Sequence, residues 1–250
     1  MDEPSPEILK DRTFRSRSLR NSRFVACDLG DVVVRGSDIA GMDLDSPWLL
    51  EDADNTFLVN GVDVAPFVDA ELNRRFPGRE LRTAADPAAL RAAWAALEQS
   101  WAATLERARA LPDGAVDASV GGEWSFAQTL RHLVHATDVW LAKAVLGAEE
   151  PFHPAGLAND DDGTGVDAEA DRPSFAEVVE VRAGRQAMVR DYLAGVTEET
   201  LAQPRRNPHD PDHEETVLSS LRTILEEEWE HHRYAVRDLE ALARGSVEAG

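Results

Sequence analysis

The sequence predicts a mainly α-helical protein with a small β part towards the N-terminus, and three observations lead to this fold class. From about residue 86 onward, apolar residues recur in steps of three and four, the spacing of an amphipathic helix. Residues 12–49 instead carry an apolar residue at every fifth position, and residues 50–85 combine a hairpin signal with a short helical pattern. We therefore expect an N-terminal tail (1–11), a repeat segment (12–49), a connector (50–85) and a four-helix bundle (86–245).

Composition and charge exclude several classes of protein. The 250-residue chain is 43% hydrophobic and holds six Trp, which excludes a disordered chain. Its formal net charge of −21 repels phosphate backbones, so we expect no nucleic-acid partner. No apolar run approaches the ~20 residues of a membrane span, and the first residues lack the apolar core of a secretory signal. The single cysteine, Cys27, excludes a disulfide framework, and a cytoplasmic protein is expected.

The repeat segment has a period of five, which fits neither a helix nor a strand. Its apolar positions are Phe14, Leu19, Phe24, Leu29, Val34, Ile39, Leu44 and Leu49. This pattern resembles the pentapeptide-repeat family, whose chain coils into a square right-handed β-helix with one repeat per side. The segment lacks the usual Ala-Asp or Ala-Asn lead-ins, and Arg17 stands at a position that is normally small. Two coils cannot bury a core alone, so we expect a structural cap or a docking module, with a second copy or another protein as partner.

The connector is expected to form two short elements. Asn60-Gly61 lies between two apolar runs and is a strong signal for a two-residue hairpin turn. Pro66 then opens a short helix that runs to Arg75 and is stopped by Pro77-Gly78. Four arginines at its end could bind an anion, although such a group is more often a solvated helix end. These arginines are Arg74, Arg75, Arg79 and Arg82.

Four segments from residue 86 onward have the apolar periodicity of helices. They lie at about residues 87–111, 125–146, 175–192 and 216–242. Ser125 is a candidate N-cap for the second segment, and Gly147 ends it. Because no strand signal lies between them, the four segments predict a four-helix bundle. The acidic, Gly-rich loop 148–173 matches part of a calcium-loop pattern, but Ala158 stands at its first ligand position, which favours a mobile, solvated loop.

The fourth helical segment carries two ionisable residues on its apolar stripe. Glu228 and His232 are four residues apart, so both side chains lie on one face and can hold one ion. A buried carboxylate at this position needs a cation, a proton or an arginine. Glu227 and His231 lie to the flanks of the stripe and are weaker candidates. The alternative is a pair of packing residues that hydrogen-bond to each other.

A third ligand has to come from another helix, and helical phase selects His132. This residue lies beside the apolar stripe of the second segment. His135, by contrast, shares its face with polar residues and is expected to be solvated. The remaining histidines fall in predicted loops and are expected to be exposed to solvent: His153, His209 and His213.

The residues around these candidates resemble the DinB superfamily. The segments that carry the resemblance are Glu123-Trp124-Ser125, Leu130-Arg131-His132-Leu133 and Glu228-Trp229-Glu230-His231-His232-Arg233. The resemblance covers about residues 86–245 and implies a metal-binding four-helix bundle. Such a bundle takes one ligand from the second helix and two, four residues apart, from the last. For this chain it implies His132, Glu228 and His232 as ligands of a divalent ion, with zinc first and nickel second. Many members have His in place of Glu228, and the His, Glu, His set is similar to the branch that contains mycothiol-dependent maleylpyruvate isomerase.

The resemblance also implies a chemistry. Three protein ligands leave a coordination position open, as in catalytic zinc sites. A low-molecular-weight thiol, mycothiol or bacillithiol, would bind there as its thiolate and attack an electrophile, in S-transfer or isomerisation. Arg233 and Arg237 could bind acidic groups of that thiol, and pairing with Glu230 and Asp238 on the surface is the alternative. A non-catalytic metal-binding or interaction module and a hydrolase that uses metal-bound water are the competing functions.

Overall fold

The computed structural model describes residues 13–24, 27–50, 55–158, 173–210 and 212–248. The predicted tail (1–11) and most of the partial calcium-loop pattern lie outside these residues. The chain divides into two compact units, Met1–Asp45 and Ser46–Gly250. Among the described residues, no helix combines the length and the apolar character needed to cross a membrane.

In the first unit, the backbone repeats its conformation every five residues. Residues with positive φ are spaced by five or by ten: Ser16, Asn21, Asp31, Gly36 and Gly41. Three tight turns follow at intervals of ten, each closed by an N–H donating to the carbonyl three residues earlier. These bonds join Ser22 to Leu19 (3.0 Å), Val32 to Leu29 (3.2 Å) and Met42 to Ile39 (2.9 Å). The residue with positive φ is the third of each turn, as in a type II turn. The five-residue period of the sequence is thus also a period of the backbone.

The described residues of this unit do not show a β-helix. No strand is present in residues 13–24 or 27–45. The apolar residues of the repeat from Phe14 to Leu44 are 44–60% exposed, so they do not form a buried core. An exposed ion pair between Arg20 and Asp38 (3.2 Å) joins residues eighteen apart, close to the length of one four-repeat coil. The unit therefore has repeat geometry without the buried interior that would stabilise a solenoid on its own.

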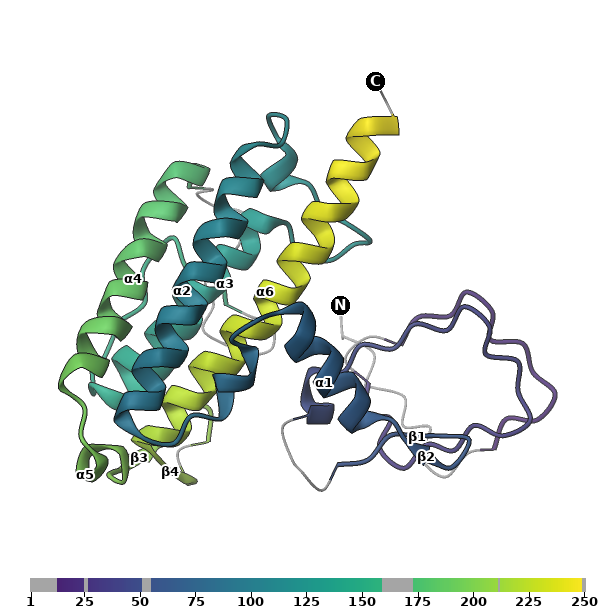
Figure 1. Ribbon diagram of the computed structural model, residues 1–250, viewed down its shortest axis with the longest axis horizontal. Helices are drawn as coiled ribbons and strands as arrows, with labels where there is room; N and C mark the ends of the chain where they lie inside the picture. The colour runs from purple at the N-terminus through teal and green to yellow at the C-terminus, as the bar shows by residue number, and fades with distance from the viewer. Residues whose placement is uncertain (1–12, 25–26, 51–54, 159–172, 211, 249–250) are drawn as a thin grey trace, which may run out of the picture. The chain divides into compact units, whose positions relative to one another are not determined.

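The second unit is built around four helices that run side by side (Figure 1). They are α2 (Pro87–Arg109), α3 (Phe126–Thr137), α4 (Phe175–Gly195) and α6 (Val217–Glu248). Helix α3 continues as a π-helix, Asp138–Val145. Contacts link α2 to α6, α6 to α3, α3 to α4 and α4 to α2, which closes the square of a four-helix bundle. The predicted bundle is thereby confirmed, and Ser125 caps α3 as expected, in a reciprocal capping box with Gln128.

The bundle core consists of the apolar stripes of these four helices. Its most deeply buried side chains include two tryptophans, Trp94 on α2 and Trp229 on α6, each 1% exposed. Smaller elements close the ends of the bundle: η3 (Ala115–Asp117), α5 (Glu198–Leu201) and a two-stranded sheet of β3 (Pro204–Arg206) and β4 (Glu214–Thr216). Strands β3 and β4 pair antiparallel, with Arg205 opposite Glu215. These short elements carry no periodic pattern long enough to be predicted from the sequence.

The connector forms the predicted hairpin and helix. After η1 (Pro47–Leu50), strands β1 (Leu58–Val59) and β2 (Val62–Asp63) pair antiparallel. Asn60 (φ 52°) and Gly61 (φ 82°) form the turn between them, and the two positive φ values are those of a type I′ turn. Helix α1 (Ala65–Arg75) follows, with proline in its first turn, and leads into η2 (Arg79–Thr83).

Gly78 allows the connector to approach the bundle closely. Its φ is +98°, and a Cβ atom there would lie 2.9 Å from the Cβ of Ala96 on α2. The indole of Trp229 on α6 lies 3.5 Å from the same point. A side chain at position 78 is therefore excluded both by backbone conformation and by space.

We expect Gly78→Ala to lower the free energy of unfolding by about 2–4 kcal/mol, from left-handed strain and overpacking together. The matched control is Gly114→Ala, because Gly114 has a similar φ (+83°) with no atom within 4 Å of the added Cβ. In the control, the free energy of unfolding should fall by only the cost of the backbone strain, about 1–2 kcal/mol. Urea unfolding followed by circular dichroism measures both, and equal losses would show that the close approach is unimportant.

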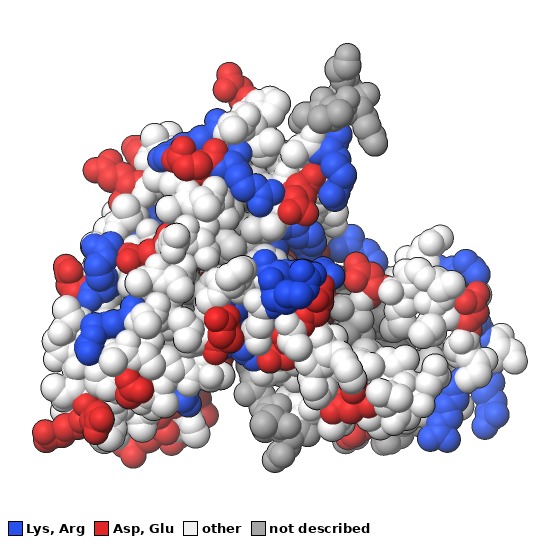
Figure 2. Space-filling model, viewed as in Figure 1, with Lys and Arg blue, Asp and Glu red and all other residues white. Residues whose placement is uncertain are grey.

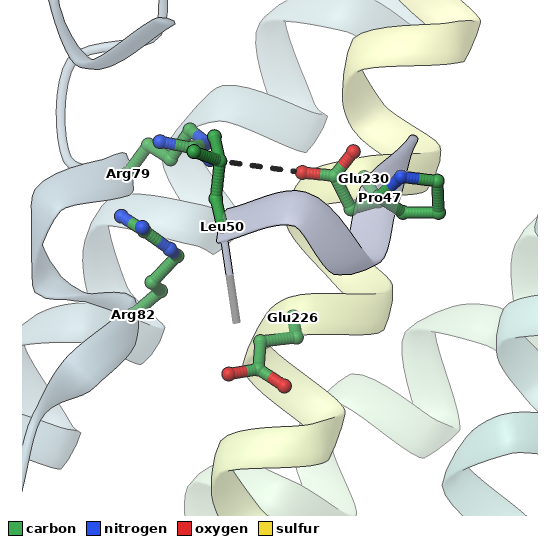
Figure 3. Close-up of a pocket in the computed structure, with 6 residues that line it drawn as sticks. All are labelled: Pro47, Leu50, Arg79, Arg82, Glu226 and Glu230. Atoms are coloured by element: carbon green, nitrogen blue, oxygen red, sulfur yellow. Dashed lines mark ion pairs between the residues drawn. The ribbon is translucent and has the colours of Figure 1, made fainter. Parts of the chain in front are cut away.

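The arginines of the connector are paired with acidic side chains. Buried Arg79 donates to Asp69 (Nη1 to Oδ1, 2.7 Å), and Arg82 donates to the same oxygen (2.8 Å). Arg74 and Arg75 donate to Glu71. Arg79 and Arg82 also line a small pocket opposite Glu226 and Glu230 of α6, together with Pro47 and Leu50 (Figure 3). Because both signs of charge meet in this pocket, the geometry does not favour an anion site there.

Candidate metal centre

Helix α3 is buried on nearly all sides. Of its twelve residues, only Gln128 is not in the buried class. Helices α4 and α6 pack against it, and residues 151–158 cover a further side. His132 lies in the middle of the helix and is 4% exposed. The structure therefore places the predicted ligand of this helix in the interior of the bundle.

The segment 151–158, which we call the strap, corrects two predictions. His135 was expected to be solvated but is 2% exposed, and its ring stacks on Phe152 of the strap at 5.3 Å. His153 was expected to be exposed but is half-buried. The strap covers a face of α3 that helical phase alone assigns to solvent, which explains both errors. His209 and His213 are exposed, as predicted.

One group of potential metal ligands is present among the described residues, and it joins α3 to α6. It consists of His132, Glu227 and His231, whose ligating atoms all lie within 4.8 Å of one another. His132 Nε2 lies 3.3 Å from Glu227 Oε2, and His231 Nδ1 lies 3.3 Å from the same oxygen. The two imidazole rings are 4.6 Å apart. Glu227 and His231 are four residues apart on α6, so one helical turn brings them together.

A carbonyl oxygen orients each of the two histidines. His132 Nδ1–H donates to the carbonyl of Leu157 (3.3 Å), and His231 Nδ1–H donates to the carbonyl of Glu227 (2.8 Å). In a neutral imidazole, a hydrogen on Nδ1 leaves the lone pair on Nε2. His132 Nε2 then faces Glu227 Oε2, and two acceptors at 3.3 Å repel each other unless a cation, a proton or a metal ion, lies between them.

The electrostatics of the group favour the protonation states that ligate metals. Burial tends to raise the pKa of Glu227, but the proximity of the His132 and His231 rings outweighs it and lowers this pKa. Burial, reinforced by neighbouring His132, lowers the pKa of His231 to about 4. An ionised carboxylate and a neutral imidazole are the forms that a divalent ion binds.

An aromatic side chain covers the group. Trp124, just before the N-cap of α3, places its indole 4.8 Å from the His132 ring and stacks on the His231 ring at 6.2 Å. Tyr234, one turn further along α6, meets the His231 ring edge-on at 5.9 Å. The centre therefore has an apolar aromatic surface beside its ligand atoms.

Glu228 is buried on the apolar stripe as predicted, but its charge partner is an arginine. It is 1% exposed and accepts a hydrogen bond from Arg182 of α4, which is itself 4% exposed. Burial raises the pKa of Glu228, and the charge of Arg182 opposes this effect. The sequence required a cation, a proton or an arginine beside this carboxylate, and the structure provides the arginine.

His232 also lies on the stripe and makes a packing contact. Its Nε2 is 2.9 Å from the hydroxyl of Thr104 on α2, and its ring packs edge-on against Phe76, Trp101 and Trp229. Burial lowers its pKa to about 4. The structure thus does not gather Glu228 and His232 with His132 in one ligand group, and the neighbouring pair, Glu227 and His231, takes that place.

The two arginines predicted to bind a cofactor are paired with acidic residues of α6. Arg233 donates to Glu230 (2.7 Å), and Arg237 donates to Asp238 (2.7 Å). Both guanidinium groups also lie over the ring of Tyr234, at 4.4 and 5.3 Å. These are the partners that the sequence offered as the alternative, but the pairs are partly buried, with Asp238 at 8% exposure. Through Tyr234, however, both arginines remain next to the candidate centre.

Helical phase favours Glu228 and His232, whereas the structure groups His132 with the pair one residue earlier, Glu227 and His231. The i, i+4 spacing is the same in both pairs, so spacing alone does not choose between them. The apolar stripe identifies the most buried face, whereas Glu227 and His231 lie at the edge of that stripe, where both side chains are half-buried. A metal centre at the edge of a core remains accessible to a substrate, and this expectation could have favoured the flanking pair.

Comparison with known proteins gives one result for the chain. The family model of the DinB superfamily matches residues 96–235, more than half of the chain and most of the bundle. No curated protein and no solved structure matches the chain.

Proposed function

We propose that this chain, which belongs to the DinB superfamily, binds a divalent metal ion through His132, Glu227 and His231. The observation that carries the proposal is the convergence of two imidazoles and a carboxylate from two helices within 4.8 Å. This set retains His132 from the sequence prediction and replaces Glu228 and His232 by the pair one residue earlier. Zinc is the first candidate for this donor set and nickel the second.

The spacing of the donor atoms supports a shared ion. Zinc–ligand bonds of about 2.0–2.2 Å hold two tetrahedral ligands about 3.4 Å apart. His132 Nε2 and Glu227 Oε2 are 3.3 Å apart, so an ion fits between them with little movement of either side chain. A cation there also removes the repulsion between the two acceptors.

A metal held by three protein ligands keeps a coordination position for an exchangeable ligand and acts there as a Lewis acid that favours the thiolate form of a thiol. We propose that a low-molecular-weight thiol such as mycothiol or bacillithiol uses this position in S-transfer or isomerisation with a small electrophile. Trp124 would pack against the apolar part of the bound molecules and limit the access of water. Arg233 and Arg237, which lie over Tyr234, would meet acidic groups of the thiol.

Two histidine variants test the proposed ligand set. Zinc affinity is measured by competition with a chromophoric chelator for wild type, His231→Asn and His232→Asn. We expect His231→Asn to lose at least about tenfold in affinity, because loss of an outer-shell partner alone costs about 10–100-fold. His232→Asn should stay within a few-fold of wild type, although it is less stable. The reverse pattern would restore the ligand set predicted from the sequence, and no zinc binding by wild type would refute the proposal.

A non-catalytic metal-binding or interaction module is the main alternative. The uneven distribution of charge along the chain supports a contact surface on the repeat segment. Residues 1–45 hold seven Lys and Arg against nine Asp and Glu, so nearly all of the net charge of −21 lies in the remainder of the chain. On the face shown in Figure 2, basic side chains lie interspersed with acidic ones. The nearly neutral repeat segment, with its exposed apolar residues, is the part best suited to contact a second copy or another protein.

An assay with a reactive electrophile distinguishes the enzyme from the module. A thiol-dependent enzyme should consume monobromobimane faster than the thiol alone, and only when both the thiol and the metal are present. Metal-dependent turnover without added thiol, beyond the one equivalent that the exposed thiol of Cys27 can consume, would instead indicate the hydrolase. Metal binding without turnover for any small thiol would favour the module.

A further inference from the structure

The strap is irregular backbone that is buried against α3. Residues 155–158 belong to neither a helix nor a strand, yet all four are buried. Buried backbone outside regular structure needs hydrogen-bond partners, because unpaired N–H and C=O groups are costly in the interior. The partners of the strap therefore show what it is attached to.

The strap is anchored at both ends. At one end, the backbone N–H of His153 donates to Asp138 (2.9 Å), which Arg185 of α4 holds in an ion pair (2.6 Å). At the other, Arg131 Nε donates to the carbonyl of Ala155 (3.0 Å), and the N–H of Leu157 donates to the carbonyl of Arg131 (3.1 Å). These bonds fix the strap to the residue that precedes His132.

The next polar group of the strap, the carbonyl of Leu157, accepts the hydrogen of His132 Nδ1 (3.3 Å). A backbone carbonyl can only accept, so this contact keeps a hydrogen on Nδ1 and directs Nε2 towards Glu227. His231 differs, because the carbonyl that fixes its Nδ1 belongs to its own helix. Only one of the two histidines thus depends on a separate segment for its orientation.

From these contacts we infer that the strap is a positioning element for the centre, in which the Leu157 carbonyl selects the tautomer and ring orientation of His132 that present Nε2 to the ion. The inference rests on the proposed metal-binding function. Hydrogen bonds to the second nitrogen of a ligating histidine fix its tautomer and raise its basicity, and their loss typically costs about 10–100-fold in metal affinity. Displacing the strap should therefore weaken the centre without altering any ligand.

Gly156 offers a way to displace the strap. A Cβ at this position would lie 3.0 Å from the carbonyl oxygen of His153 and 3.4 Å from the Cβ of His135. Gly156→Ala should therefore open the turn in which the Gly156 N–H donates to the His153 carbonyl (2.8 Å), and so shift the strap directly before Leu157. Gly184→Ala is the matched control, because a Cβ there has no neighbour within 4 Å. A second variant, Arg131→Met, removes the donor to the Ala155 carbonyl by a different route.

Two measurements test the inference in the full-length protein. The first is zinc affinity by chelator competition, which should fall about 10–100-fold in Gly156→Ala and Arg131→Met and stay unchanged in Gly184→Ala. The second uses the metal-free protein, in which nuclear magnetic resonance follows the solvent exchange of the His132 Nδ1–H. This hydrogen should exchange slowly in wild type and in the control, and markedly faster in both strap variants. Circular dichroism confirms that all variants keep their helical content.

The outcomes separate the two proposals. If wild type binds zinc and both strap variants bind it equally well, the positioning role is refuted while the metal site stands. If wild type binds no zinc, the proposed function fails, and with it the metal-directed role of the strap. Slow Nδ1–H exchange that persists in both strap variants would show that the Leu157 carbonyl does not hold His132.

Discussion

Replacing Arg182 by Met should lower the free energy of unfolding by about 3–5 kcal/mol, because it leaves the carboxylate of Glu228 buried without a charge partner. Both side chains lie inside the bundle, at 5% and 1% exposure. Burial already raises the pKa of Glu228, and removal of the guanidinium would raise it further. The unpaired carboxyl group must then either remain charged in an apolar interior or take up a proton, and both are unfavourable at neutral pH.

A second arginine on the same helix provides the control. Arg190 of α4 pairs with Glu98 of α2 (2.7 Å), but its side chain is 56% exposed. Arg190→Met should therefore cost at most about 1 kcal/mol. Urea unfolding followed by circular dichroism compares the two variants under the same conditions. Similar losses for both would mean that the buried pair has no special role in stability.

A double variant tests the cause of the loss. If the penalty comes from an unpaired buried charge, Arg182→Met combined with Glu228→Met should be more stable than Arg182→Met alone, since apolar side chains can replace a buried ion pair at little cost. A double variant as unstable as the single one would instead point to lost packing around Arg182, including its position 6.0 Å from the ring of Trp101.

Zinc should stabilise the wild-type protein against thermal unfolding. An ion that binds only the folded state contributes about 2.7 kcal/mol when its free concentration is 100 times the dissociation constant. For a domain of this size, such a gain raises the midpoint by about 5–10 °C. Differential scanning fluorimetry with and without zinc measures the shift, and addition of EDTA should reverse it.

Two neighbouring glutamates make this prediction specific. Glu227→Gln removes the carboxylate ligand and should abolish the zinc-dependent shift. Glu226→Gln makes the same chemical change one residue earlier, on the side of α6 that lines the pocket shared with Arg79 and Arg82, and should keep the shift (Figure 3). If both variants keep the shift, zinc stabilises the protein from another site, and the proposed centre is wrong.

Much of the fold was predictable because long amphipathic helices and turn signals are local properties of the sequence. Asn60-Gly61 forms the expected turn, Ser125 caps α3, and the four helices pack as a bundle. The burial of Glu228 and His232 was also predicted correctly from helical phase.

The environment of the centre was not predictable to the same degree. The choice between Glu227 and Glu228 depends on which side chain of α4 faces the stripe, and Arg182 lies 46 residues from its partner along the chain. The burial of His135 depends on the strap, whose sequence has no periodic pattern. Both are tertiary contacts between distant segments, which override the local signal.

The all-round burial of α3 has a consequence for the exchange of an ion at the proposed centre. Amide hydrogens in a helix enclosed on every side exchange with solvent only when the whole domain opens, whereas irregular segments open locally at lower free energy. We therefore expect the helix that carries His132 to open slowly, and the irregular segment whose Leu157 carbonyl contacts His132 to open more easily. An ion could therefore enter or leave the centre through a local opening of the strap, without unfolding of the helix that supplies the ligand.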